Sequence, residues 1–186
     1  GDEIVVSLYQ QEASYYVNNY GMIPESLNKT YTVSGLDEYV EDFSDISEDA
    51  VSELKSESED IITAYAAQNF SDENSLKALE YAGYVINTAK TPEDAYTYNM
   101  LFIIYKGDVT NSEGEFSKTT VYYPVAFTNV VSSEGGDVDY ETGGEIYGYS
   151  YIGGTSYRTT GYTDPYTCYM NIATAYADDY NLASGD

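Results

Sequence analysis

The sequence has no histidine and no tryptophan, a single cysteine, and only seven lysines and arginines among 186 residues. Without histidine there is no imidazole for general base catalysis or zinc binding, and Ser–His–Asp and Cys–His hydrolase mechanisms are excluded. Because Cys168 is alone, the chain forms neither an internal disulfide nor a dithiol redox site. These absences predict a protein that is not an enzyme, with no catalytic residues, no metal site and no cofactor.

Positive charge is scarce against 32 carboxylates, and the formal net charge is −25. Such a surface repels nucleic acid and anionic lipid head groups, so neither is expected as a direct partner. The same charge keeps the chain soluble and attracts basic partners or divalent cations. The charge therefore indicates a solvated surface, and it leaves the oligomeric state open.

Long apolar runs are also missing, since none approaches the roughly 18 residues needed to cross a bilayer. The chain begins with Gly1 rather than methionine. We therefore expect a preceding segment that holds a signal peptide, a lipid-attachment cysteine or a membrane helix. Few cysteines with many acids and tyrosines are typical of the exterior of a Gram-positive bacterium, which predicts an extracellular, cell-surface-anchored protein.

What the chain does contain is 42% hydrophobic residues and 24 tyrosines, enough to build one folded core. In the first half, apolar residues at spacings of three and four predict a helix over residues 4–20. A short strand is expected at Thr30–Val33. A second, longer helix is predicted over 47–69, with Ser47 as its N-cap and its acids on the wet face.

The second half of the sequence has the apolar runs and turn residues that are typical of β-strands. Leu76–Val85 could continue as helix or begin a strand, and Gly83 with the run Tyr84-Val85-Ile86 favours a strand. Residues 96–105 read as a central strand that is apolar on both faces. Gly107-Asp108 and residues 111–114 predict a hairpin loop, and residues 119–131 its return strand. Pro124 would leave one ladder bond unmade, which predicts an edge or a bulge there.

The remaining strands are expected at 145–151 and 155–161, as one strand or as a hairpin through Gly153-Gly154. Thr163-Asp164-Pro165 is a helix start signal, and it predicts a C-terminal helix over about 164–180. The fold class is therefore α+β: an antiparallel meander of three to four strands packed against two or three helices, which lie on one face. We expect a single domain over 1–186, with helices in about 4–70 and the sheet in about 81–161.

Alternating tyrosines form the candidate binding site. Tyr147, Tyr149 and Tyr151 share one face if they lie in a strand, and Tyr157 and Tyr162 follow soon after. If exposed, they give rigid, amphipathic contact area of the kind that binding surfaces favour, for sugar rings or a partner protein. If buried, they are the sheet face beneath the helices.

Carboxylates offer two further hypotheses. Asp137, Asp139 and Glu141 alternate as calcium ligands do, but Thr142 and Gly148 stand where an EF-hand needs glycine and glutamate. This favours a solvated acidic loop, with an irregular calcium loop as the alternative. A glycosidase needs only two carboxylates across a cleft, so the sequence alone leaves such an enzyme open.

Four segments carry a resemblance: Tyr81-Ala-Gly-Tyr-Val, Asn99-Met-Leu-Phe-Ile-Ile-Tyr, Val121-Tyr-Tyr-Pro-Val-Ala-Phe-Thr-Asn and Gly161-Tyr-Thr-Asp-Pro. In these segments, about half of the chain resembles the extracytoplasmic domains of uncharacterised membrane-anchored proteins or lipoproteins of gut Firmicutes. The resemblance implies an exported location and no assigned activity, and it transfers no functional residues.

The sequence thus predicts a non-enzymatic extracytoplasmic module for binding, adhesion or sensing in a bacterial cell-surface protein. The expected partner is a cell-surface or envelope protein or a glycan. A small-ligand pocket between sheet and helices is the second hypothesis. A carboxylate-based hydrolase is the third.

Overall fold

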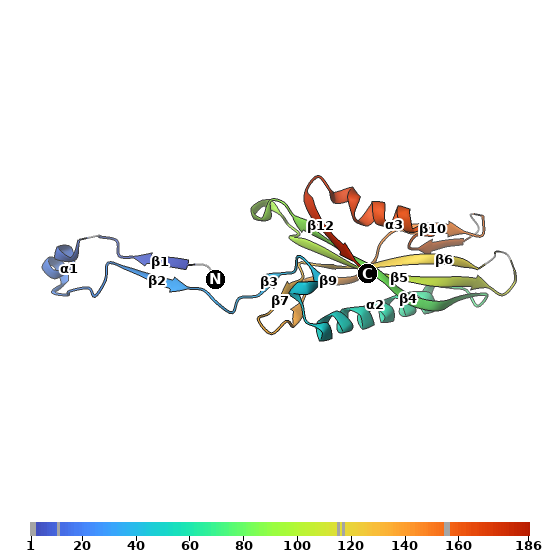
Figure 1. Cartoon of the computed structure of the whole chain (residues 1–186), viewed down its shortest axis with the longest axis horizontal. Coiled ribbons are helices and arrows are strands. Elements are labelled where there is room, and N and C mark those ends of the chain that lie inside the picture. Colours follow the sequence, from blue (N-terminus) through green and yellow to red (C-terminus); the bar gives the residue numbers. More distant parts are fainter. Residues whose placement is uncertain (1–2, 11, 115, 117, 155–156) are drawn as a thin grey trace. The chain divides into compact units, whose positions relative to one another are not determined.

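The computed structural model describes residues 3–10, 12–114, 116, 118–154 and 157–186. Its contacts divide the chain into two compact units, Gly1–Leu36 and Asp37–Asp186, where the sequence predicted one domain. These are called the N-terminal unit and the C-terminal unit below. Figure 1 shows the elements of both, coloured along the chain.

The N-terminal unit is a β-hairpin with a short helix between its strands. Strand β1 (Glu3–Ser7) pairs antiparallel with β2 (Asn28–Thr32), and helix α1 covers Ala13–Tyr20. The helix predicted over 4–20 is therefore wrong in its first half, because consecutive β-branched residues favour an extended chain over a helix. Gly21, at φ 67°, ends the helix as predicted. The short strand predicted beside it is confirmed by β2.

The C-terminal unit contains three sheets and two α-helices in its described residues. In chain order its elements are β3 (Glu38–Tyr39), α2 (Glu48–Asn69), β4 (Asn74–Ala89), β5 (Asn99–Asn111), β6 (Thr119–Thr128), β7 (Val131–Ser132), β8 (Val138–Asp139), β9 (Thr142–Ile146), β10 (Tyr149–Ile152), β11 (Tyr157–Thr160), α3 (Pro165–Ile172) and β12 (Tyr180–Gly185). The main sheet has the order β12-β4-β5-β6-β9, beside a β3-β7-β8 sheet and a β10-β11 hairpin. The α+β class is confirmed, with more strands than the three or four predicted.

The main sheet is covered on both faces, because its central strand is apolar on both faces. Leu101 and Ile103 on β5 point into the core beneath α2, whereas Met100 and Phe102 belong to a second cluster beneath α3. Figure 1 shows α2 and α3 on opposite sides of the strands. The prediction that the helices share one face is wrong, since one covered face would leave Phe102 in water.

Two β-bulges keep the apolar side chains of strand β4 directed toward the core. The first lies between Lys77 and Glu80, and the second follows Tyr81. Each bulge inserts one residue and so reverses which side chains face α2. As a result Leu76, Tyr81 and Ile86 all pack against the same cluster despite their mixed spacing. This mixed spacing explains why the sequence left the start of the strand ambiguous.

Helix α2 lies where the sequence predicted it. Ser47 caps it, since its Oγ accepts a hydrogen bond of 3.1 Å from the Ala50 N–H. Leu54 and Ile62 are buried against the sheet, and Glu48 lies in the first turn, where the helix dipole favours a negative charge. The acidic stretch is therefore the wet face of a packed helix, as predicted.

Two predictions at turns and ends need correction. Gly107-Asp108 lies inside β5 rather than in a loop, paired with β4 and β6. The glycine gives room to a neighbour instead of making a turn, since a Cβ there would stand 2.6 Å from the Leu76 Cδ1. The C-terminal helix ends at Ile172 instead of residue 180, and Tyr180 begins β12. Pro124 pairs with Ile104 on one side, and on the other its carbonyl accepts a 2.9 Å hydrogen bond from the Tyr147 N–H. Because proline has no N–H, the return bond of this second pair is unmade, as predicted. Within the described residues, no helix is both long and apolar enough to cross a bilayer.

Candidate binding surface

The structure separates the five candidate tyrosines into exposed and packed side chains. Tyr149 and Tyr151 are exposed on β10, at 56% and 54% of their full accessible area. Tyr147 and Tyr162 are partly buried in the cluster beneath α3. Tyr157 packs edge-on against Phe116, with ring centroids 5.5 Å apart, on the side of the core that α2 covers. The predicted tyrosine surface is therefore smaller than expected.

A glycine explains why Tyr147 does not share a face with Tyr149. Gly148 adopts φ 80°, a left-handed conformation that turns the chain between β9 and β10. A Cβ there would lie 2.1 Å from the Cζ of Tyr162, so that ring packs directly on the glycine. Tyr147 instead meets Phe102 edge-on at 5.2 Å. The prediction that Tyr147, Tyr149 and Tyr151 share one face is therefore wrong for Tyr147.

The hairpin β10–β11 presents one aromatic face and buries the other. Tyr151 lies opposite Arg158 in register, and Tyr149 and Tyr151 meet edge-on with ring centroids 6.2 Å apart. The Arg158 guanidinium lies 4.5 Å from the centre of the Tyr149 ring, a cation–π contact. On the reverse side Ile152 and Thr159 are buried. Tyr149, Tyr151 and Arg158 are called the tyrosine–arginine face below.

Polar contacts fix this hairpin to the rest of the unit. The Tyr65 hydroxyl of α2 accepts a 2.7 Å hydrogen bond from the Thr160 N–H. The Ser150 Oγ accepts one of 3.1 Å from the Thr163 N–H. The hairpin is thus tied to the body at several points, which presents its exposed rings with little freedom. Arg158, the only arginine of the chain, was missed from the sequence, although the predicted hairpin through Gly153-Gly154 places it on the strand beside these tyrosines.

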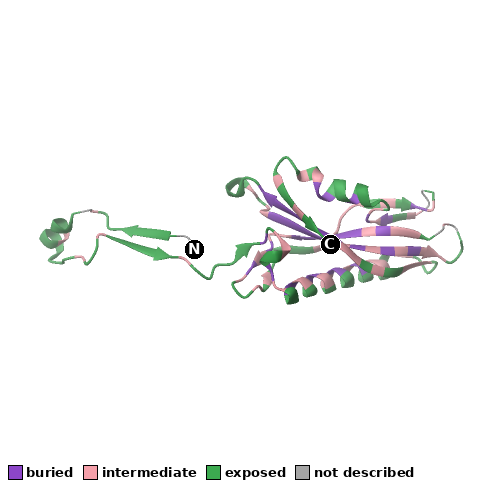
Figure 2. Cartoon of the chain, viewed as in Figure 1, coloured by how far each residue is buried: buried purple, intermediate pink, exposed green. Residues whose placement is uncertain are grey.

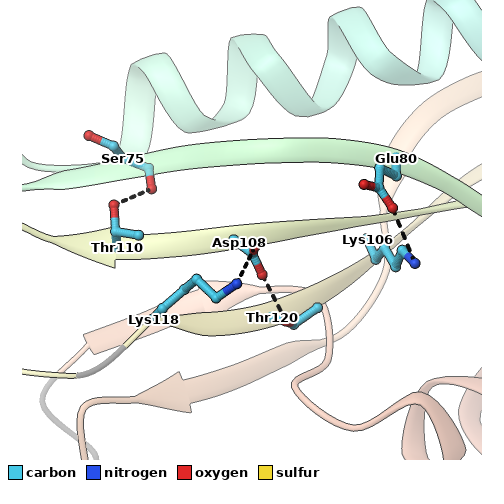
Figure 3. Close-up of polar contacts among 7 residues, drawn as sticks. All are labelled: Ser75, Glu80, Lys106, Asp108, Thr110, Lys118 and Thr120. Carbon is cyan, nitrogen blue, oxygen red and sulfur yellow. Dashed lines mark hydrogen bonds and ion pairs between the residues drawn. The ribbon is translucent and has the colours of Figure 1, made fainter.

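A polar depression of about 320 Å³ opens on the sheet, and Figure 3 shows its ion pairs. The Lys106 Nζ lies 3.2 Å from a Glu80 carboxylate oxygen, and the Lys118 Nζ lies 2.8 Å from an Asp108 oxygen. Thr120 donates a 2.8 Å hydrogen bond to the same carboxylate. The hydrogen bonds from Lys118 and Thr120 lower the pKa of Asp108. Both carboxylates are paired with lysine, and Asp108, which stays ionised, is not poised to donate a proton.

The alternating acids of the 137–141 loop point to different partners. The Asp139 carboxylate accepts a 2.8 Å hydrogen bond from the Tyr140 N–H. The Glu141 carboxylate accepts one from the Asn129 amide. Within the part of the chain that the structure describes, no three acidic or cysteine side chains gather as a metal site would require.

A second depression, of about 300 Å³, runs beside the edge strand β12. Its lining residues are Glu41, Thr88, Ala89, Pro92, Tyr98, Asn181, Leu182 and Ala183. The Tyr98 hydroxyl donates a 3.2 Å hydrogen bond to Glu41. Its lining therefore mixes polar groups, the Glu41 carboxylate among them, with apolar side chains such as Pro92 and Leu182.

The N-terminal unit exposes apolar side chains that would have shared one face of the helix predicted over 4–20. None of its described residues is buried, and Figure 2 shows it as exposed nearly throughout. The register of β1 and β2 places Ile4, Val6 and Tyr31 on one face of the hairpin. Ile4 and Val6 are 54% and 55% exposed. The tip adds Tyr9 and Ile23, which are still more exposed.

Comparison with protein-family models, with curated proteins and with solved structures finds no match for this chain.

Proposed function

We propose that this protein is a non-enzymatic binding module of a bacterial cell-surface protein and that the tyrosine–arginine face contacts its partner. The observation that carries the proposal is the pair of exposed rings, Tyr149 and Tyr151, with Arg158 against one of them on an anchored hairpin. Tyrosine and arginine are enriched among the residues that dominate binding energy at protein interfaces. Rings held in place lose little conformational entropy on binding.

Charge selects the class of partner. The N-terminal unit holds four of the 32 acids and one of the seven bases, so 28 acids and six bases leave a net charge of −22 on the C-terminal unit. Such a field steers positively charged surfaces toward the protein and repels acidic ones. A cell-surface or envelope protein with a basic binding site is therefore the partner that fits best. The complex should weaken as salt is raised.

An extracytoplasmic location belongs to the same proposal. It is supported by the acidic, cysteine-poor composition and by the resemblance described above. Burial raises the pKa of the Cys168 thiol to about 12, so that thiol stays protonated and unreactive in an oxidising exterior. Fractionation of the native organism, with an antibody against this chain, tests the location. Recovery from the cytosol alone would end this part of the proposal.

The binding test compares two changes to exposed tyrosines. The purified chain is immobilised and its binding to solubilised envelope proteins is measured, followed by measurement against the isolated partner. Replacing both Tyr149 and Tyr151 by alanine should lower affinity at least about tenfold, as the loss of two interface rings does. Tyr96→Ala is the matched control, since Tyr96 is exposed in the connection between β4 and β5, outside the hairpin. Equal loss in both variants, or none in either, contradicts the assignment of this face.

Two other outcomes would change the class of function. Binding to purified envelope polysaccharide that Tyr149→Ala and Tyr151→Ala abolish would assign the face to a glycan. Turnover of any substrate would overturn the non-enzymatic proposal.

A second candidate function is binding of a small ligand at the polar depression on the sheet. Lys106 and Lys118, two of only seven cations, line it together with Thr120. A small carboxylate-bearing ligand would have to compete with Glu80 and Asp108 for these lysines. Titration with a panel of small organic acids, monitored by amide NMR shifts, tests it, with Lys118→Ala as the variant expected to abolish the shifts.

A further inference from the structure

We propose that the β1–β2 hairpin of one copy adds as strands to the free edge of β12 in a second copy, so that chains assemble head to tail. This inference uses neither the tyrosine–arginine face nor its partner. It begins from two sheet edges that the structure leaves open. Among the residues that the structure describes, β12 has β4 as its one neighbour in the main sheet, and β1 has β2 as its one neighbour in the hairpin.

Strand β1 has the character of a donor strand. From Ile4 to Gln10 the chain carries no charge and no glycine or proline, and it begins with three consecutive β-branched residues. Uncharged segments of this kind pair readily when their edge is free. The Leu8 N–H donates to the Leu27 carbonyl at 2.8 Å, and bonded pairs alternate along an antiparallel ladder. The Val5 N–H therefore points to the open edge.

Strand β12 has the character of a recipient edge. It pairs with β4 over six residues without a register shift. The Lys90 N–H donates to the Asp179 carbonyl at 2.9 Å, and the same alternation directs the N–H groups of Leu182 and Ser184 outward. The depression beside this strand is lined by Pro92 and Tyr98 as well as Leu182. Apolar side chains of an added strand have a place to pack there.

The hairpin needs such a support. A two-stranded hairpin alone is marginally stable in water. Ile4, Val6 and Tyr31 form an apolar face on which none of these side chains is buried. Addition to a five-stranded sheet supplies backbone partners for one edge and covers part of this face.

Charge favours the N-terminal unit, rather than a second C-terminal unit, as the part of another copy that makes contact. Two C-terminal units, each with a net charge of −22, repel one another, whereas the N-terminal unit carries only −3 from four acids and one base. That base is Lys29, whose Nζ lies 4.9 Å from the centre of the Tyr31 ring on the apolar face. The recipient depression contains the carboxylate of Glu41, which has the complementary sign.

Length is also sufficient. A stable protein interface takes about 20–30 residues from each partner. The N-terminal unit has 36 residues, and none of those described is buried within the chain. Because donor and recipient are different surfaces, each copy can use both at once, and the assembly stays open instead of closing as a symmetric dimer.

The test measures the mass of the full chain by sedimentation velocity from about 1 µM to about 1 mM, the range in which weak association becomes visible. The mass should grow beyond a dimer with concentration, and added salt should strengthen assembly by screening the acidic units. Val5→Pro removes the outward donor N–H, and Ser184→Pro removes an outward N–H of the recipient edge. Both should stay monomeric, whereas Val5→Thr and Ser184→Thr should assemble as the unchanged chain does.

Mixing the two proline variants makes the test specific. Val5→Pro keeps an intact recipient edge and Ser184→Pro keeps an intact donor, so the mixture should form a one-to-one dimer and stop there. Circular dichroism checks that both variants fold, and either variant alone tests its own edge. A monomer at every concentration overturns the proposal. This holds even if the amides of β1 are protected from hydrogen exchange, since β1 would then pair within its own chain. An assembly that Ser184→Pro leaves intact, or a dimer that never grows, overturns it as well.

Discussion

Replacing Asn99 by alanine should destabilise the C-terminal unit by about 3–5 kcal/mol, a large fraction of the stability of a domain this size. The Asn99 side chain is completely buried at the start of β5. Its Nδ2 donates to the carbonyls of Val40 and Val130 at 2.7 and 2.8 Å, and its Oδ1 accepts from the Val130 N–H at 2.7 Å. One amide thus joins three segments that lie far apart in the sequence.

The magnitude follows from what alanine would leave behind. Each lost hydrogen bond removes about 1 kcal/mol. The Val130 N–H loses the acceptor that Asn99 supplies, and a buried group left unpaired costs a further 1–3 kcal/mol or so. The Val130 carbonyl still accepts a 3.0 Å hydrogen bond from the Val40 N–H, so its loss is partial.

Urea unfolding is the assay, followed by far-UV circular dichroism or by tyrosine fluorescence, which no tryptophan masks in this chain. Asn171→Ala is the matched control. Its Nδ2 also donates to a carbonyl, that of Thr167 at 2.8 Å, but on an exposed helix face. It should cost no more than about 0.5 kcal/mol. A loss below about 1 kcal/mol for Asn99→Ala would refute the reasoning, since the amide would then not be joining these segments.

Three further predictions concern capping, backbone conformation and pH. Ser47→Ala removes the cap of α2 and should lower the free energy of unfolding in urea by about 1 kcal/mol. An unchanged value would show that the Ser47 cap does not stabilise the helix. Gly161→Ala should lower the free energy of unfolding by more than about 2 kcal/mol, because φ at Gly161 is 95° and a Cβ there would lie 2.5 Å from a backbone oxygen. Gly114→Ala is the control: φ is 74° but a Cβ there would meet open space, so the loss should be only about 1 kcal/mol. Burial raises the pKa of Tyr81, and a hydrogen bond to a carboxylate that of Tyr140, from 10.0 to about 12 in each case. Because both tyrosines have a higher pKa in the folded state than in the unfolded state, they stabilise the fold fully below pH 10, and this stabilisation is lost as pH rises through 12. Tyrosinate absorbance should therefore rise together with unfolding. Titration that is complete before the chain unfolds would contradict this prediction.

Local signals predicted the elements whose reasons are local. Ser47 and the apolar positions of α2 lie within one segment, and both its start and its buried face could be predicted from that segment alone. The β4–β5–β6 meander was also readable, because its strands are apolar runs separated by short connections. The start signal Thr163-Asp164-Pro165 correctly predicted the start of α3, where the Asp164 carboxylate accepts a 2.7 Å hydrogen bond from the Thr167 N–H.

Elements that depend on distant partners could not be predicted in the same way. Tyr176 and Tyr180 continue a helical spacing, yet Tyr180 lies in a strand because β4 offers it an edge. The apolar residues of β1 fit a helical stripe too, and pairing with β2 decides otherwise. In the candidate site, Gly148 was the visible signal that Tyr147 would turn away, but the ring of Tyr162 that packs on this glycine could not be predicted from the sequence.

The place of β12 has a consequence for how the chain folds. β4 receives its outer partner from residues 180–185, long after β5 and β6 have been made. During synthesis or export, one side of the longest strand stays unpaired until the last residues of the unit emerge, and such non-local pairings form slowly. The bulges of β4 twist that waiting strand and so discourage other chains from pairing with it prematurely.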